Sequence, residues 1–254
     1  MHGINSAIIA VGIALNILIL ACLVRWRTFR KFPVFTAYLI FIPFRSAIGA
    51  VILSNERLYY DFYWITAPVE IALALLAVLE IFWSVFRIFR ILRWFRFVLP
   101  GTIAATLMYS AWQGYRLPPD QATPSGAAII HATVTSHYVI LAVALLFFLL
   151  SIFLAVSLPM HQHRFMLGFA LVSLAVVFGG SVRMAFGPYS DFVSREGPPL
   201  GYLAALLIWL SAALRPVPEQ PAFHSLSEAH WKKVVENLKI QLHYVSSFAR
   251  NSRR

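Results

Sequence analysis

The sequence predicts an all-α membrane protein, a bundle of about seven transmembrane helices with the amino terminus outside and the carboxyl terminus in the cytoplasm. Three observations lead to this fold class: an apolar composition, long apolar runs, and basic residues gathered on one side. Of the 254 residues, 60% are hydrophobic and 12% are charged, and the mean hydropathy is +0.74. A soluble domain carries about 25% charged residues. Lipid as solvent explains uninterrupted apolar runs, whereas water does not.

Seven apolar runs are expected to cross the bilayer, for which about 20 helical residues suffice. The fourth run is the weakest, and the fifth is long enough that it must tilt or protrude. The runs are Ile4–Val24, Pro33–Leu53, Tyr63–Phe86, Phe97–Gln113, Ala128–Leu158, Phe165–Gly187 and Leu200–Leu214.

The basic residues indicate the orientation. Sixteen Lys and Arg residues fall in the expected inner loops and the tail, and three fall in the outer loops, where 116–126 and 187–199 are rich in turn-forming residues. Because Lys and Arg concentrate on the cytoplasmic side, we expect an odd number of spans with the tail inside. The three outer residues are Arg57, Arg116 and Arg195.

The chain divides into a transmembrane domain over 1–215 and a cytoplasmic tail over 216–254. Ser225-Leu-Ser-Glu228 matches a capping box, and apolar residues then recur at spacings of three and four, which predicts an amphipathic helix over about 226–248. The interpretation we favour is a helix lying on the inner leaflet, supported by its Lys and Arg. The alternative is a docking helix for a cytoplasmic protein partner.

The net charge of +11 would suggest nucleic acid in a soluble protein. Here the membrane side accounts for the basic residues, so we expect lipid partners, including anionic inner-leaflet lipids, and no nucleic acid. Cys22 is the single cysteine, which excludes an intrachain disulfide. The basic residues near the first span follow its apolar run, whereas those of a signal peptide precede it. The first span is therefore expected to be a retained helix.

No cofactor is predicted. The lysines lie outside the spans, so a retinal Schiff base has no attachment point. His131 and His137 share one span, six residues apart, and do not form a facing pair for haem, although a single axial ligand remains an alternative. The pair His161 and His163 fits a solvated turn better than a metal site. We found no catalytic constellation and predict no metal ligand and no catalytic residue.

Ionisable groups inside a bilayer are costly, so each calls for a partner or a function. Arg45, Glu70 and Arg183 are expected at similar depths in the outer half, where Arg45 or Arg183 can pair with Glu70. Prolines and a Gly-Gly pair, which interrupt or bend helices, occur at this depth. Such interruptions are tolerated where the backbone faces protein or a water-filled cavity. We therefore predict a polar ligand cavity lined by Arg45, Glu70, His137 and Arg183. The alternative is that these groups are interhelical bonds that only fix the bundle.

A second intramembrane pair is expected in the inner half. Glu80 and Asn16 lie at nearly the same depth on the third and first spans. A protonated Glu80 hydrogen-bonded to Asn16 would satisfy both side chains without a buried charge.

Three segments carry a resemblance to a known family. Tyr-Asp-Phe-Tyr-Trp-Ile-Thr-Ala-Pro-Val-Glu at 60–70 precedes Glu80-Ile-Phe, the turn Pro-Met-His-Gln-His-Arg-Phe at 159–165 leads into Gly168, and Leu214-Arg-Pro ends the last span. Over most of the chain it resembles a group of seven-helix membrane proteins from soil-type bacterial genomes, for which no function is assigned. Leu79 departs from the aromatic residue often found before the glutamate. The resemblance implies a bacterial origin and this topology, and we expect a multi-pass protein of the cytoplasmic (inner) membrane.

The function expected from these features is non-enzymatic: a small-ligand sensor or binding protein, or an accessory subunit of a membrane complex. One alternative is a small-solute or proton-coupled transporter that uses Glu70 or Glu80 as a titrating carboxylate. A chain without a detectable internal repeat differs from common carriers built from paired halves. A second alternative is an intramembrane lipid-modifying enzyme with His137 and Glu70 as acid and base.

Overall fold

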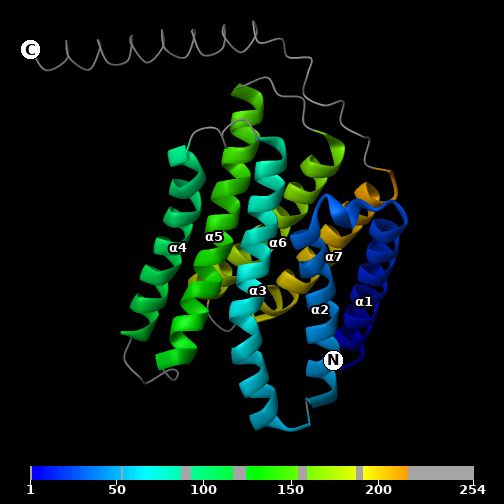
Figure 1. The fold of residues 1–254 in the computed structure, drawn as a ribbon. Helices are drawn as coiled ribbons and strands as arrows, with labels where there is room; N and C mark the ends of the chain where they lie inside the picture. The colour runs from blue at the N-terminus through cyan, green and yellow to red at the C-terminus, as the bar shows by residue number, and fades with distance from the viewer. Residues whose placement is uncertain are drawn as a thin grey trace, which may run out of the picture. The chain divides into compact units, whose positions relative to one another are not determined.

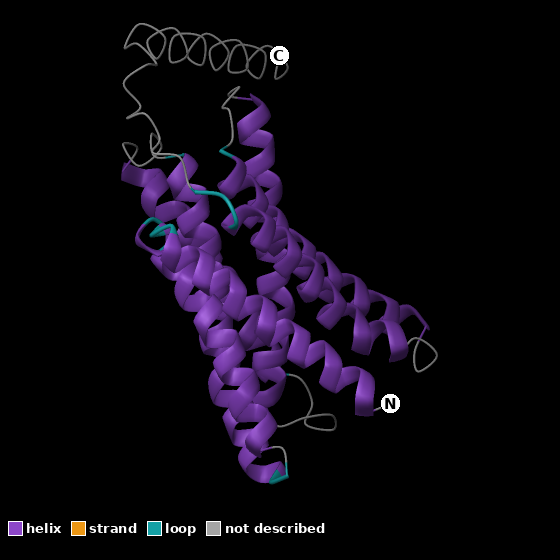
Figure 2. Cartoon of the chain, turned by 90° about the vertical axis from the view of Figure 1, so that its right-hand side faces the viewer, coloured by secondary structure: helices purple, strands orange, loops and turns teal. Residues whose placement is uncertain are grey.

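The computed structural model describes residues 2–52, 54–86, 93–116, 124–153, 159–186 and 191–216. Within these ranges the regular secondary structure is entirely helical (Figures 1 and 2). The helices are α1 (His2–Arg25), the short 3₁₀ helix η1 (Thr28–Arg30), α2 (Pro33–Ile52), α3 (Glu56–Val85), α4 (Arg93–Tyr115), α5 (Pro124–Phe153), α6 (Met160–Phe186) and α7 (Asp191–Ala213).

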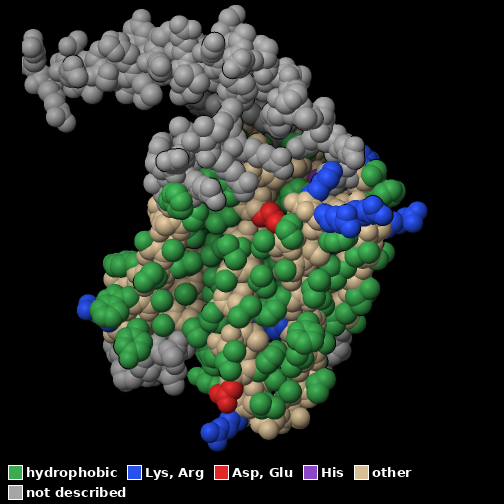
Figure 3. Space-filling view, viewed as in Figure 1, with side chains coloured by type: hydrophobic (Ala, Val, Ile, Leu, Met, Phe, Trp, Pro, Cys, Tyr) green, Lys and Arg blue, Asp and Glu red, His purple; other side chains and the backbone are tan. Residues whose placement is uncertain are grey.

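Four of the described helices are long and apolar enough to cross a membrane. Their apolar spans lie within α2, α3, α5 and α6. The apolar part of α1, at Ala10–Arg25, is shorter than these spans. Large apolar side chains cover the visible face of the bundle (Figure 3), and Val51 is 81% exposed. In water such a surface would mark an interface or an aggregation risk, whereas lipid is its matching solvent. These features indicate a helical membrane protein.

The helices pack around α3. It contacts α2, α5 and α6, while α1 packs against α2 and α7, α4 packs against α5, and α6 packs against both α5 and α7 (Figure 1). α2 and α7 make no direct backbone contact; instead, aromatic side chains bridge them. The Phe35 ring centroid lies 5.3 Å from that of Trp209, and the Tyr38 centroid lies 6.2 Å from it.

One end of the bundle is basic. We call it the basic end, and it contains the turn between α1 and α2, the start of α6 and the end of α7. Blue side chains gather at the α1–α2 turn in Figure 3, and the exposed basic residues of this turn are Arg25, Arg27, Arg30 and Lys31. The turn between α2 and α3 lies at the opposite end (Figure 1).

The first residues of α2 and α3 show how the local sequence determines where each helix begins. Asn55 caps α3, because its side-chain oxygen accepts a hydrogen bond of 3.1 Å from the Leu58 amide. α2 begins at Pro33, whose missing N–H and fixed φ suit the first helical position. Phe32, which precedes it, has no side-chain oxygen to cap the helix, so the cap must come from elsewhere.

An aromatic cluster packs the basic half of the bundle. Trp209 of α7 is fully buried, and its indole N–H donates a 3.0 Å hydrogen bond to the Phe165 carbonyl of α6. This approach requires Gly168, because a Cβ there would overlap the indole. Gly201 of α7 likewise faces Ala175, where a Cβ would clash. Small residues thus allow α6 and α7 to pack closely.

The predicted all-α fold is confirmed for the described residues, and four of their helices are long and apolar enough to span a membrane; seven spans and the orientation stay predictions. Two boundaries were wrong. α3 starts at Glu56, several residues before the expected Tyr63. α7 starts at Asp191, so residues 191–199 of the outer loop expected at 187–199 are helical. The tail helix expected at 226–248 lies outside the described residues.

Candidate functional site

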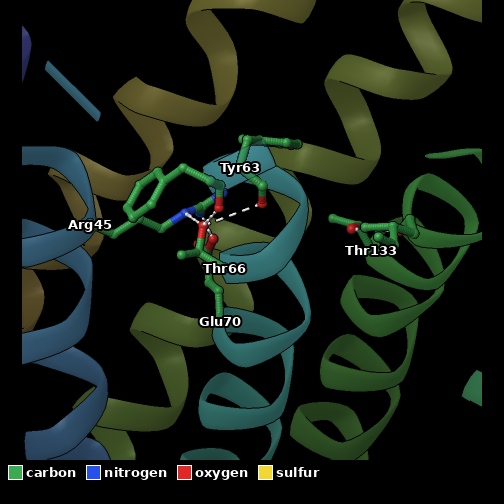
Figure 4. A network of polar contacts seen from close by, with 7 residues as sticks. Arg45, Tyr63, Thr66, Glu70 and Thr133 are labelled. Atoms are coloured by element: carbon green, nitrogen blue, oxygen red, sulfur yellow. Dashed lines mark hydrogen bonds and ion pairs between the residues drawn. The ribbon is translucent and has the colours of Figure 1, made fainter. Parts of the chain in front are cut away.

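An ion pair joins α2 to α3 in the half of the bundle away from the basic end. The Arg45 guanidinium contacts the Glu70 carboxylate through Nη1, and its Nε donates a 2.8 Å hydrogen bond to the Thr66 hydroxyl (Figure 4). The Tyr63 ring lies 5.0 Å from the guanidinium carbon, within cation–π range. Three residues of α3 therefore hold one arginine of α2.

The sequence explains why α3 can offer these contacts together. Tyr63, Thr66 and Glu70 recur at spacings of three and four, so they share one face of the helix. Thr66 also donates a 2.8 Å hydrogen bond to the Phe62 carbonyl, which fixes its hydroxyl for Arg45. Thr66 was not predicted from the sequence, although its position one turn before Glu70 was the available signal.

A pocket of about 310 Å³ opens beside Arg45 between α2 and α3. We call it the outer pocket, and it combines one cationic side chain with aromatic rings. The Nη2 atom of Arg45 has no hydrogen-bond partner among the described residues, which leaves it available to a ligand. The pocket is lined by Arg45, Ser46, Gly49, Ala50, Tyr59, Phe62 and Tyr63.

The ion pair is partly buried and sets the charge of the outer pocket. The side chains of Arg45 and Glu70 are 17% and 35% exposed. Glu70 balances the charge of Arg45, so the pair adds no net charge to the bilayer region. The pocket can donate hydrogen bonds from a guanidinium without presenting an unpaired cation.

Asn16 and Glu80 do not form the predicted pair, because each has other partners. The Glu80 carboxylate accepts hydrogen bonds from the Val34 and Phe35 amides, at 3.0 and 2.9 Å, and so caps the start of α2. Depth alone suggested the pair, but two free amides at a helix start are stronger donors for a carboxylate. This capping role was not foreseen from the sequence.

Asn16 is 1% exposed and links α1 to α7. Its amide nitrogen donates a 2.8 Å hydrogen bond to the Gly12 carbonyl, and its oxygen accepts a 3.2 Å hydrogen bond from the Tyr202 hydroxyl. The buried amide is thus satisfied within its own part of the bundle.

The other two predicted cavity residues are not brought to Arg45 by any described contact. His137 of α5 pairs through Nδ1 with the Ser173 hydroxyl of α6, at 3.1 Å. Thr133, one helical turn before His137 on α5, also lies away from the ion pair in Figure 4. Arg183 lies on α6, but its side chain is outside the described part of the chain.

The first residues of α6, at the basic end, hold α6 to α7. The solvated turn expected at His161 and His163 was wrong, because both lie within α6 and His161 is buried. His161 Nε2 lies 3.0 Å from the Arg215 carbonyl, and Arg164 donates hydrogen bonds of 2.8 Å to the carbonyl and hydroxyl of Ser211. A cation near the last carbonyls of α7 is favourable for that helix. In the described ranges, no three His, Cys, Asp or Glu side chains are placed to hold a metal ion.

Comparison of the chain with known protein families, with characterised proteins and with solved structures gives no match, so the resemblance to the seven-helix bacterial group stays a prediction.

Proposed function

We propose that this chain is a non-enzymatic, multi-pass membrane protein that binds a small amphiphilic ligand in the outer pocket, as a sensor or as an accessory subunit. The carrying observation is the outer pocket itself, where Arg45 is held by Glu70 and Thr66 beside aromatic rings. Ligand sites are typically apolar concavities with a few placed polar groups. An amphiphile can reach such a site from the bilayer.

The proposal includes seven spans with the amino terminus outside and the tail in the cytoplasm. The basic end carries the Arg and Lys residues of the α1–α2 turn, together with Arg164 and Arg215. This asymmetry supports a cytoplasmic basic end by the positive-inside rule. The outer pocket then faces the external half of the bilayer. We propose the cytoplasmic membrane of a bacterium as its location.

The proton-coupled transporter is the first competing function, and the position of Glu80 argues against it. Both carboxylate oxygens of Glu80 accept hydrogen bonds from backbone amides of α2. The carboxylate therefore caps the start of this helix instead of lining a pocket. Glu70 is engaged with Arg45. Neither carboxylate lines the outer pocket or the second pocket, which lies between α1, α2 and α7.

The lipid-modifying enzyme needs His137 and Glu70 as an acid–base pair. His137 instead pairs with Ser173 on α6, and Glu70 pairs with Arg45 on α2. General acid–base catalysis requires both groups within hydrogen-bond reach of one substrate. The separate partners favour binding over catalysis.

The test compares the amphiphiles that copurify with the protein when native membranes are solubilised directly into polymer nanodiscs. Arg45→Gln removes the guanidinium from the pocket. Arg116→Gln is the matched control, because Arg116 also stacks on an aromatic ring, Trp112, at 4.4 Å, and does not line the pocket. Mass spectrometry of the extracted lipids identifies the bound species.

We expect a discrete small amphiphile with the wild type and with Arg116→Gln, and about tenfold less with Arg45→Gln, the effect of one charge-assisted hydrogen bond. Gly49→Ala narrows the same pocket, and its Cβ would meet the Tyr59 ring at an ordinary 3.6 Å. It therefore serves as a second variant if Arg45→Gln fails to assemble. Identical lipid profiles in all four proteins would contradict the proposal.

A further inference from the structure

A second pocket, of about 140 Å³, lies between α1, α2 and α7. We call it the deep pocket. Ser46 lines both this pocket and the outer pocket. The deep pocket is lined by Gly12, Ile13, Asn16, Ile42, Pro43, Ser46, Pro199, Tyr202 and Leu203.

The two pockets follow the same face of α2. At about 100° per residue, Ile42, Ser46 and Gly49 point within about 60° of one another. From Ile42 to Ala50 the helix rises about 12 Å, with the deep pocket nearer the basic end. The two pockets are separate cavities that adjoin at Ser46 and follow one another along α2, and we call the two together the α2 crevice.

The packing of the bundle explains why this crevice exists. α2 and α7 make no direct backbone contact, and Phe35 and Tyr38 meet Trp209 only toward the basic end. Further along α2, Pro43 and Ser46 face the space that these aromatic rings leave unfilled. The aromatic cluster therefore occupies the space between α2 and α7 toward the basic end, and Tyr38 lies one helical turn before Ile42, where the deep pocket begins.

The chemistry changes along the crevice. The outer pocket holds Arg45, with Nη2 available as a donor. In the deep pocket, the Tyr202 hydroxyl donates to Asn16, and Asn16 donates to the Gly12 carbonyl. These groups satisfy one another, so the remaining surface is mostly apolar side chains. The polar end of a ligand therefore belongs at Arg45, and an apolar part belongs below Ser46.

We infer that the α2 crevice binds a single-chain amphiphile with an uncharged, hydrogen-bond-accepting head at Arg45 and its apolar chain in the deep pocket. This inference rests on the proposed function and specifies its ligand. The head is uncharged because Glu70 already balances Arg45. The crevice length of about 12 Å selects an extended chain over a compact solute.

The experiment uses photoreactive decanol with a diazirine next to its methyl end, added to full-length protein in phosphatidylcholine nanodiscs. After illumination, mass spectrometry maps the labelled peptides. Gly12→Ala narrows the deep pocket, and its Cβ would meet Leu203 at an ordinary 3.7 Å. Gly101→Ala is the matched control on α4, since a Cβ there meets nothing within 4 Å.

We expect saturable labelling of the α1 and α7 peptides that contain Ile13 and Leu203, competed by unlabelled decanol. Gly12→Ala should lower the apparent affinity about fourfold, the effect of displacing one methylene, while Gly101→Ala should not change it.

Two outcomes overturn the inference, and they are distinguishable. Saturable labelling confined to α2 and α3, lost with Arg45→Gln and unchanged by Gly12→Ala, refutes the deep chain site and leaves the proposed function standing. Unsaturable labelling of exposed residues such as Val51 and Ile152 shows bulk lipid only and overturns the inference, while the lipid profiles of the wild type and Arg45→Gln decide the proposed function separately.

Discussion

Arg45 of α2 and Glu70 of α3 form an ion pair in the half of the bundle opposite the basic end, with Thr66 as a third partner. The pair places one donor-rich side chain at the outer pocket while keeping the local charge balanced. Its stabilising and ligand-binding contributions are separable by experiment, because only Arg45 lines the pocket.

The Arg45–Glu70 pair should couple α2 to α3 energetically. Glu70→Gln leaves the Arg45 charge unbalanced, and Arg45→Gln does the same to Glu70, so each single variant should lower the unfolding midpoint in detergent. The double variant should recover part of the loss, with a coupling energy of about 1 kcal/mol, typical of polar contacts in bilayers. Strictly additive effects of the two substitutions would show that the pair contributes no coupling.

Glu80→Gln should loosen the start of α2. An amide offers one acceptor oxygen, so one of the two hydrogen bonds from Val34 and Phe35 is lost. The loss of a helix cap costs about 1 kcal/mol. Hydrogen exchange at the Val34 and Phe35 amides should accelerate. Ser84→Ala is the control, because within the described residues its hydroxyl donates to the Ile81 carbonyl of its own helix; equal exchange in both variants would contradict the capping role.

Gly168→Ala should destabilise the contact between α6 and α7. The new Cβ would overlap the Trp209 indole, which cannot move without losing its hydrogen bond to the Phe165 carbonyl. Overpacking of this kind costs about 1–3 kcal/mol. Thermal unfolding measures the effect. Gly180→Ala on the same helix has nothing within 4 Å of its Cβ and should be neutral or slightly stabilising; a similar loss there would rule out the clash as the cause.

The proposed orientation predicts which turn of the bundle is reachable from outside. In a Cys22→Ala background, a membrane-impermeant maleimide should label Ser54→Cys in intact spheroplasts and Arg30→Cys only after lysis. Both native side chains are exposed, so access and not burial decides the result. The reverse pattern of labelling would place the basic end outside.

The sequence predicted the helices well, because apolar runs report the lipid that surrounds them. It failed at the start of α7, where Pro198 and Pro199 suggested a loop. Proline removes a helical hydrogen bond, but neighbouring helices can compensate for the freed carbonyl in a membrane. Rules that read prolines as loops in soluble proteins therefore place the start of such a membrane helix too late.

Part of the candidate site was also predictable. Matching depth and opposite charge led to the Arg45–Glu70 pair, which the structure contains. The same argument failed for Asn16 and Glu80, since depth fixes the height of a residue but not the direction in which its side chain points. The available signal for Glu80 was the lack of a capping side chain before Pro33, which left the start of α2 in need of an acceptor.

Pro43 divides α2 between two anchors. On one side, Glu80 and the aromatic cluster fix the helix; on the other, Arg45 is the tie to α3. Proline cannot donate a backbone hydrogen bond to the Leu39 carbonyl, so α2 has one backbone bond fewer between these two anchors. We therefore expect the loss of one anchor to loosen the half of α2 that it holds more than the other half.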